Sequence, residues 1–344
     1  MGFPFLDAVT ISMSFVIGGS LSSGNSQYPW NIDNIGVHKF TLAHNQTPES
    51  YVTMQFAMFC DEVTRLSDGK ITFDQRVAGT LLADNEALDG VMNGVADFVH
   101  IKASQHVGTI PDLSPMTLVG LHDFSDWEGF CADLAPILDD IYAEYGIKHI
   151  GLLPETYTLI VNTIKPIRKP SDTIGMTFRA SGRWTSLTVS AWGSAATTIP
   201  LPDLADAFNR GSVDGVMVGW NIVVPFAIYE VTPYVSVTDL TENGSSLVMT
   251  KSTFDKLNAD EQALLEYVGH EWQFTTKQVT FDWCDQYRKF IEGEGRNEII
   301  DLTPEECAEF RRLALGLLDD MIPELSPLGI QLVNILKDYH GIPR

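Results

Sequence analysis

A single arginine at the end of a predicted strand is the residue best suited to binding a ligand. The stretch Met176 to Arg179 alternates as a strand, and a glycine turn and a helix that opens near Ser181 follow it. Open α/β sheets bind ligands at the carboxyl ends of their strands, and a helix N-terminus favours negative charge. A guanidinium there can hold a carboxylate through two hydrogen bonds. We therefore predict that Arg179 and Ser181 contact an organic anion; the alternative is a salt bridge from Arg179 within its own domain.

Three more residues each have two open interpretations. Arg183 lies in the first helical turn, where the helix dipole disfavours a cation, and is either a second anchor or a solvated surface side chain. Lys102 follows an apolar strand and either meets a second acidic group on the ligand or points to solvent. Trp220 follows the predicted strand Val213 to Val218 and is either a wall of the pocket or part of the core.

Polar residues at strand ends in the first half of the chain are further candidates. His44 and Asn45 follow a predicted strand that begins at His38, and Glu86 lies at the start of a predicted helix. Asn45 is equally suited to capping a helix. We include His44, Asn45 and Glu86 in the predicted ligand site.

Sequence signatures of catalysis are largely missing. The motifs of serine hydrolases, dinucleotide and phosphate binding and zinc proteases do not occur, and the eight histidines are scattered. The four cysteines are widely spaced and form no C-x-x-C motif. We expect no metal, no cofactor and no enzymatic activity; an α/β enzyme acting on small carboxylates is the alternative.

The elements that must position these residues form two α/β units. A β-α-β-α-β pattern runs from His38 to Ile101 and predicts a parallel sheet, and a second unit surrounds Arg179. Helical spacing then continues from Asn258 to Ile291, about 50 Å of helix at 1.5 Å per residue. A helix of that length exceeds a small domain, so we predict that it crosses two lobes with a ligand cleft between them. The expected division is residues 37–154 plus about 244–286 for the first lobe, and residues 155–243 plus about 287–344 for the second.

Composition and charge restrict the partners. The 344 residues include 45 acidic and 22 basic side chains, a formal net charge of −23, which makes nucleic acid and anionic membrane surfaces poor partners. Residues 1–36 combine a small, apolar run with a polar tail, and we interpret them as an export signal and linker, although no basic residue precedes Lys39. The alternative is a native extension.

Four segments together resemble a known family. The segments are FTLAHN, GVADFVHI, IKPIRKPSDTIGMTFRASG and AFNRGSVDGVMVGWN, which cover most of residues 38 to 290 in order. With them the chain resembles the solute-binding proteins of tripartite ATP-independent periplasmic (TRAP) transporters, of the C4-dicarboxylate-binding type. The resemblance implies a two-lobed, type II periplasmic-binding fold that closes on an organic acid and delivers it to a membrane permease.

The resemblance also carries expectations about single residues. It places Arg179 on the arginine that fixes the ligand carboxylate, and Asn45, Glu86 and the region from Val218 to Asn221 near the cleft. Sialic-acid-binding members have a second arginine whose place is taken here by Tyr157.

The differences from the sugar-acid binders suggest a different ligand. The few polar groups at these positions favour an aromatic or apolar carboxylate, with Tyr157 and Trp220 against its body. A C4-dicarboxylate or a sugar acid is the alternative ligand, and a second carboxylate would meet Arg183 or Lys102. We expect a periplasmic, monomeric binding protein whose partners are this acid and the permease.

Overall fold

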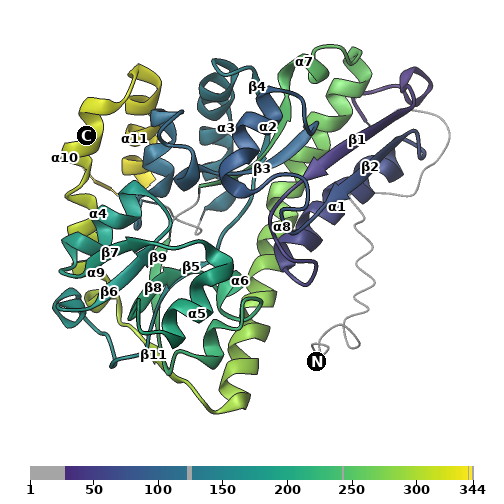
Figure 1. Cartoon of the computed structure of the whole chain (residues 1–344). Coiled ribbons are helices and arrows are strands. Elements are labelled where there is room, and N and C mark those ends of the chain that lie inside the picture. Colours follow the sequence, from purple (N-terminus) through teal and green to yellow (C-terminus); the bar gives the residue numbers. More distant parts are fainter. Residues whose placement is uncertain (1–27, 122–125, 242–243, 340, 343–344) are drawn as a thin grey trace.

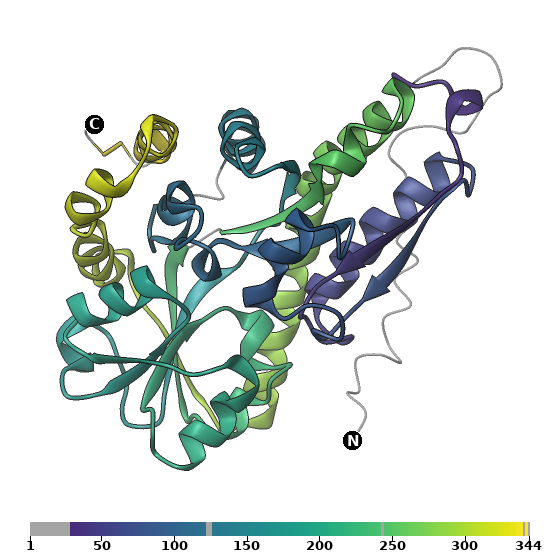
Figure 2. The same ribbon diagram turned by 45° about the horizontal axis from the view of Figure 1, so that its top comes forward.

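The computed structural model describes residues 28–121, 126–241, 244–339 and 341–342, which form two β-sheets surrounded by helices (Figure 1). The α/β class and the two-lobed architecture predicted from the sequence are confirmed. Most of the proposed export signal falls in residues 1–27, outside the described residues. Figure 2 shows the two sheets from a second direction, with the second sheet at the lower left.

The first sheet has five strands in the order β2-β1-β3-β10-β4. Strands β1, β2 and β3 run parallel, as the β-α-β-α-β pattern predicts, whereas β10 pairs antiparallel with β3 and β4. The chain returns to this sheet only after completing most of the second one, so local periodicity could not place β10. The strands are β1 (His38–Ala43), β2 (Ile71–Arg76), β3 (Phe98–Lys102), β4 (Ile147–Leu152) and β10 (Ser245–Thr250). Their helices are α1 (Tyr51–Leu66), η2 (Asp84–Glu86), α2 (Ala87–Met92), η3 (Ala103–Gln105), η4 (Pro111–Thr117), α3 (Trp127–Ala143) and α7 (Lys251–Phe254).

The second sheet has six strands in the order β11-β9-β5-β8-β6-β7. Strand β6 is parallel to both β7 and β8, so its carboxyl end meets theirs at one edge, while β5 is antiparallel to β8 and β9. The strands are β5 (Tyr157–Asn162), β6 (Thr177–Ala180), β7 (Ala195–Thr198), β8 (Gly215–Val218), β9 (Tyr234–Thr241) and β11 (Glu298–Asp301). Their helices are η5 (Pro170–Thr173), α4 (Arg183–Ala191), η6 (Leu201–Asp203), α5 (Leu204–Asn209), α6 (Trp220–Val223), η7 (Ile228–Glu230) and α9 (Pro304–Leu315).

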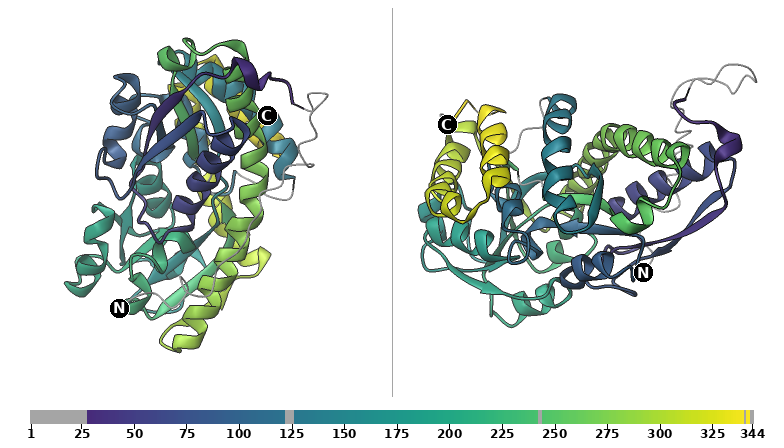
Figure 3. Two further views of the ribbon diagram at one scale, coloured as in Figure 1. Left: turned by 90° about the vertical axis from the view of Figure 1, so that its right-hand side faces the viewer. Right: turned by 90° about the horizontal axis from the view of Figure 1, so that it is seen from above.

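The long helix α8 (Ala259–Glu294) joins the two halves, as its sequence predicts. Asn258 caps its first turn, and no proline interrupts it. Figure 1 and the left view of Figure 3 show it running past both sheets. One hydrophobic cluster includes Trp272 of α8, Phe98 of the first sheet and Leu159 of the second. The packing of α8 therefore holds both sheets to one core.

Two segments pack in ways that were not predicted from the sequence. Residues 28–36 were expected to be linker, but Trp30 stacks on Tyr28 and both rings contact Tyr267 of α8. Helix α11 (Pro327–Tyr339) follows α10 (Leu318–Met321) and η8 (Ile322–Glu324), and packs beside α3 on the first sheet's side. The division of the chain into lobes by residue number stays a proposal.

Two further properties concern the described residues alone. None of their helices combines the length and the apolar character needed to cross a membrane. The four cysteines are buried and free, so no disulfide links the described elements. Burial raises the pKa of the Cys60 thiol above its usual range, as expected for a cysteine that serves as a small apolar side chain.

Candidate functional site

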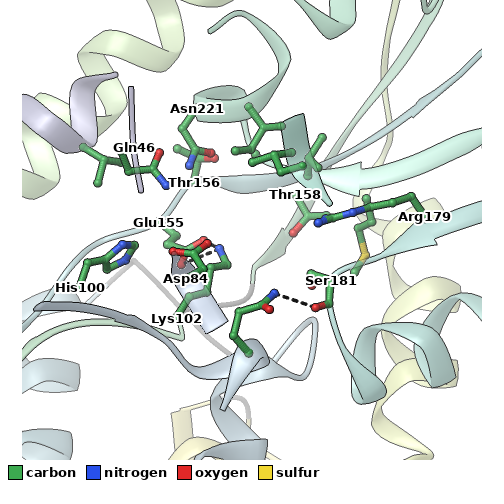
Figure 4. A pocket seen from close by; sticks show the side chains of 17 residues that line it. Gln46, Asp84, His100, Lys102, Glu155, Thr156, Thr158, Arg179, Ser181 and Asn221 are labelled. Carbon is green, nitrogen blue, oxygen red and sulfur yellow. Dashed lines mark hydrogen bonds and ion pairs between the residues drawn. The ribbon is translucent and has the colours of Figure 1, made fainter. Parts of the chain in front are cut away.

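A cleft between the two sheets brings together polar side chains from both of them (Figure 4). From the first sheet's side come Gln46, Val52, Asp84, His100, Lys102 and Gln105. The connection into β5 and the second sheet supply Glu155, Thr156, Thr158, Arg179, Ser181, Leu201, Met217, Val218, Gly219, Asn221 and Ile222. Because the lining comes from both sheets, a ligand bound here would contact both halves of the molecule.

Arg179 lies in this cleft, at the edge of the second sheet where β6, β7 and β8 meet. Its side chain is 9% exposed, and its Nε donates a hydrogen bond to the carbonyl oxygen of Ile199 at 3.0 Å. Figure 4 shows the guanidinium extending along the cleft beside Thr158. The Ile199 contact fixes the direction of the side chain, which places the outer face of the guanidinium along the cleft wall.

Lys102 also lines the cleft, where it forms an ion pair with Glu155. Its Nζ lies 3.0 Å and 2.8 Å from the two carboxylate oxygens. Ser245 donates a hydrogen bond to the same carboxylate, and His100 Nε2 lies 3.0 Å from the Ser245 hydroxyl. This chain of contacts ties β3 and β10 to the connection that leads into β5. Lys102 therefore points into the cleft and not to solvent.

Asp84 is the second acidic group of the cleft. One of its carboxylate oxygens accepts a hydrogen bond from Asn45 Nδ2, and Gln46 Nε2 in turn donates to Asn45 Oδ1 at 2.9 Å. Burial raises the pKa of the Asp84 carboxyl to about 6, against the opposing effects of Lys102, Asn45 and Arg179. The cleft thus contains two acidic side chains, Asp84 and Glu155, and two basic side chains, Lys102 and Arg179.

The segments that follow β3 and β6 touch at one end of the cleft. Gln105 lies after β3, and Ser181 lies after β6. The Gln105 Nε2 atom donates a hydrogen bond of 2.8 Å to the Ser181 carbonyl oxygen. Beside it, Gly182 packs against Ser104 so closely that a Cβ atom would overlap the Ser104 carbonyl oxygen. These contacts hold the halves together in the arrangement seen here.

Four of the predicted site residues line the cleft: Arg179, Lys102, Ser181 and Asn221. Asn45 does not line the cleft, but it donates a hydrogen bond to Asp84, which does. Strand-end positions and the resemblance together therefore pointed to residues that line this cleft, and their role in binding stays a prediction.

The two aromatic candidates do not lie in the cleft. Tyr157 is 38% exposed and packs edge-on against Phe281, because alternation along β5 turns Thr156 and Thr158 into the cleft and Tyr157 away from it. Trp220 is 5% exposed and belongs to the hydrophobic core. The structure corrects the expectation that these rings form the pocket wall.

Three polar candidates also lie elsewhere. Arg183 is exposed, pairs with Glu324 through two hydrogen bonds of 2.6 Å and 2.7 Å, and stacks over a neighbouring tryptophan, so it is a surface residue. Glu86 is exposed and accepts a hydrogen bond from the backbone of Ala83. His44 is buried near Phe56, and burial lowers its pKa to about 4, so it is a neutral core residue.

Sequence reasoning missed the acids of the site. Neither Glu155 nor Asp84 is among the ligand residues predicted from the sequence. Their partners Lys102 and Asn45 are 53 and 39 residues away in the chain, so no local pattern joins them. The only sequence signal for these two cleft residues was that each is an acid that follows a strand and has apolar neighbours in the sequence. Among the described residues, no group of three or more metal-binding side chains is arranged to hold a metal ion.

Comparison with known proteins gives a consistent result. The family model of the bacterial extracellular solute-binding proteins, family 7, matches residues 42–324. A solute-binding protein of Albidiferax ferrireducens is 24% identical over 301 residues, which is 80% of this chain and 87% of that protein.

Two solved structures have the same fold. The extracytoplasmic solute receptor of Bordetella pertussis that binds pyroglutamic acid aligns with a TM-score of 0.78, 20% identity and coverage of 88% of this chain and all of that one. A TRAP periplasmic solute-binding protein of Sulfitobacter with bound β-D-galacturonate aligns with a TM-score of 0.77, 20% identity and coverage of 88% and 100%. At this identity the two structures show a shared fold, and the ligand of the present chain has to be argued from its own cleft.

Proposed function

Because the chain belongs to family 7 of the bacterial extracellular solute-binding proteins, we propose that it captures a small organic acid in the periplasm and delivers it to a TRAP-type membrane permease. Arg179 is the proposed anchor of the ligand carboxylate. The observation that carries the proposal is the position of this guanidinium, 9% exposed, in a cleft lined from both sheets. A buried arginine beside a cleft offers an anion two parallel hydrogen bonds that a point charge cannot match.

The remaining lining favours a polar acid. Apart from Arg179, the lining includes amides, hydroxyls and charged groups, while the two aromatic rings expected there lie elsewhere. Buried polar groups that do not have all their hydrogen bonds within the protein need partners on the ligand, and a purely apolar ligand body would supply none. We therefore favour a small acid with further polar groups over an aromatic acid. The two solved relatives named above bind pyroglutamic acid and galacturonate, which are acids of this kind.

Binding in this proposal is coupled to closure. An open form admits the acid, Arg179 pairs with its carboxylate, and the two halves then approach each other. In the closed form Gln105, after β3, donates its hydrogen bond to Ser181, and Gly182, after β6, packs against Ser104. The closed form presents one continuous surface to the permease. The strongly negative chain makes nucleic acid an improbable partner on electrostatic grounds.

Calorimetry on Arg179 variants tests the proposal. A thermal-shift screen of aliphatic, hydroxy, amino, sugar and aromatic acids first identifies an acid that binds, since a ligand at 100 times its Kd stabilises by about 2.7 kcal/mol. Arg179→Ala should then weaken its binding by roughly 30-fold to several thousand-fold, because removing one partner of a buried charge pair costs about 2 to 5 kcal/mol. Arg179→Lys should recover only part of that loss.

Arg168→Met is the matched control. Arg168 is exposed in the same half of the molecule and pairs with Glu306, outside the cleft lining. This variant should bind as tightly as the wild type. Undiminished binding by Arg179→Ala would show that the anchor is elsewhere. Mass spectrometry of the released compound separates the proposal from the alternative of an enzyme, since a binding protein returns its ligand unchanged.

A further inference from the structure

Asp84 has more capacity to accept hydrogen bonds than the protein uses. An ionised carboxylate has about four acceptor positions on its two oxygens. Within the part of the chain that the structure describes, only Asn45 donates a hydrogen bond to this side chain. Asp84 lies in the wall of the cleft, so its remaining acceptor positions are available to a bound molecule.

The other acid of the cleft is in a different situation. Both oxygens of Glu155 contact Lys102 Nζ, at 3.0 Å and 2.8 Å, and Ser245 donates a further hydrogen bond. The charge of Glu155 is therefore balanced within the protein. Asp84 has a neutral amide as its hydrogen-bond partner and has Lys102 and Arg179 only as more distant charges.

Closure around a ligand makes this difference important. As the halves approach, water leaves the cleft, and a carboxylate that loses its water without gaining a donor is strongly destabilised. A second ligand carboxylate near Asp84 would add repulsion between like charges. A donor on the ligand would instead replace the lost water and offset the negative charge.

We propose that the ligand is a monocarboxylate that carries a second group able to donate a hydrogen bond, an N–H or O–H, and that this group binds Asp84. The carboxylate of the same molecule pairs with Arg179, so the inference rests on the function proposed above. Arg179 requires the ligand to have a carboxylate, and Asp84 selects among carboxylates those that also have a hydrogen-bond donor. Simple dicarboxylates are disfavoured by this selection.

Matched pairs of acids test the selection by Asp84. Each of two pairs differs in one neutral donor: pyroglutamate against 5-oxotetrahydrofuran-2-carboxylate, and lactate against propionate. With the full chain and isothermal calorimetry, the wild type should bind the donor-bearing member of at least one pair 10-fold or more tighter than its partner. The first pair reports an N–H donor, and the second reports an O–H donor.

Substitutions of Asp84 test whether this residue causes the preference for the donor-bearing acid. Asp84→Ala, which removes the acceptor, should bring the ratio within each pair close to one, and Asp84→Asn, which keeps the size, should lower it by at least 3-fold. Arg179→Ala should weaken both members of a pair alike. Asp89→Ala is the control, because Asp89 is an exposed acid five residues away and outside the lining. Thermal melting without ligand verifies that each variant is folded.

The outcomes separate the two proposals. If the wild type binds donor-free acids as tightly as donor-bearing ones, or if the ratio is the same in Asp84→Ala, the role of Asp84 is refuted while an Arg179 effect leaves the proposed function standing. If a dicarboxylate such as succinate binds more tightly than every donor-bearing monocarboxylate, the ligand class is also wrong. If no acid of the full screen binds, both proposals fail.

Discussion

At the scale of single residues, Asp84 should lower the stability of the empty protein. Its pKa of about 6 lies above the reference value of 3.8, so the folded state binds the proton more tightly than the unfolded chain does. The resulting penalty is absent well below pH 3.8, grows between the two pKa values and is complete above about pH 6. The difference between a pKa of about 6 and one of 3.8 corresponds to on the order of 3 kcal/mol.

The variant Asp84→Asn makes this penalty measurable. At pH 8 it should raise the free energy of unfolding of the empty protein by about 1 to 3 kcal/mol, as measured by urea denaturation. At pH 5 the gain should fall to roughly half of that value, because the native wild type is then largely protonated at this carboxyl. An equal gain at both pH values would mean that the charge of Asp84 is not the cause.

Local sequence patterns could predict the cation of the site but not its acids. Arg179 follows a short alternating strand and precedes a glycine turn, and these features are contiguous in the chain. The acceptors Asp84 and Glu155 depend on partners from other elements, which only the folded chain brings together. Tyr157 was misplaced because its side depends on the register of β5, and an error of one residue moves a side chain to the other face.

At the scale of elements, the crossing of α8 over β4 depends on a close backbone contact. A Cβ atom at Gly269 would overlap the carbonyl oxygen of Ile150 and lie 2.8 Å from its Cγ2 atom. The neighbouring backbone cannot move aside as a flexible side chain could. Gly269→Ala should therefore lower the free energy of unfolding by about 1 to 3 kcal/mol, a typical cost of overpacking, measured by urea denaturation.

The same helix supplies the control. Gly293 also lies in α8, but nothing is within 4 Å of a Cβ atom placed there. Gly293→Ala should raise the free energy of unfolding by about 0.5 to 1 kcal/mol, because alanine loses less backbone entropy on folding. A destabilisation of similar size in both variants would mean that the contact with Ile150 does not determine the result.

Most elements could be predicted because their signals are local. Helix α8 has a continuous helical pattern and a capping asparagine, and α9 begins with a capping box at Thr303. The helix predicted to start near Glu86 is short, since the 3-10 turn η2 precedes α2 and α2 ends at Met92. Asn93 and Gly94 end this helix, with Gly94 at a left-handed φ of 68°, so the sequence contains a stop signal that the expected helix passed over.

At the scale of the whole molecule, the sequence predicts the number of α/β units better than it predicts the contacts between distant elements. Two α/β units and a crossing helix follow from periodicity and length. The return of α11 to α3, and the packing of Trp30 on α8, depend on hydrophobic contacts between residues far apart in the sequence. The contacts at the end of the cleft also depend on the folded chain, because the segments that follow β3 and β6 meet there.

Gly182→Ala should make the closed arrangement harder to reach. Its Cβ atom would overlap the carbonyl oxygen of Ser104 across the end of the cleft, so the halves would have to stay slightly apart. A strain of about 1 to 3 kcal/mol would weaken ligand binding by roughly 5-fold to 100-fold. Small-angle X-ray scattering at saturating ligand should also give a larger radius of gyration than for the wild type. The stability of the variant without ligand should change little if the empty protein is open.

The control for this substitution is Gly108→Ala. Gly108 lies near η3 in the first half, and nothing is within 4 Å of a Cβ atom placed there. Binding and scattering of this variant should match those of the wild type. If Gly182→Ala binds its ligand as tightly as Gly108→Ala and compacts to the same radius, the ligand-bound form does not use the Ser104 contact. The contact described here would then belong to the empty protein, and closure on the ligand would bring different surfaces together.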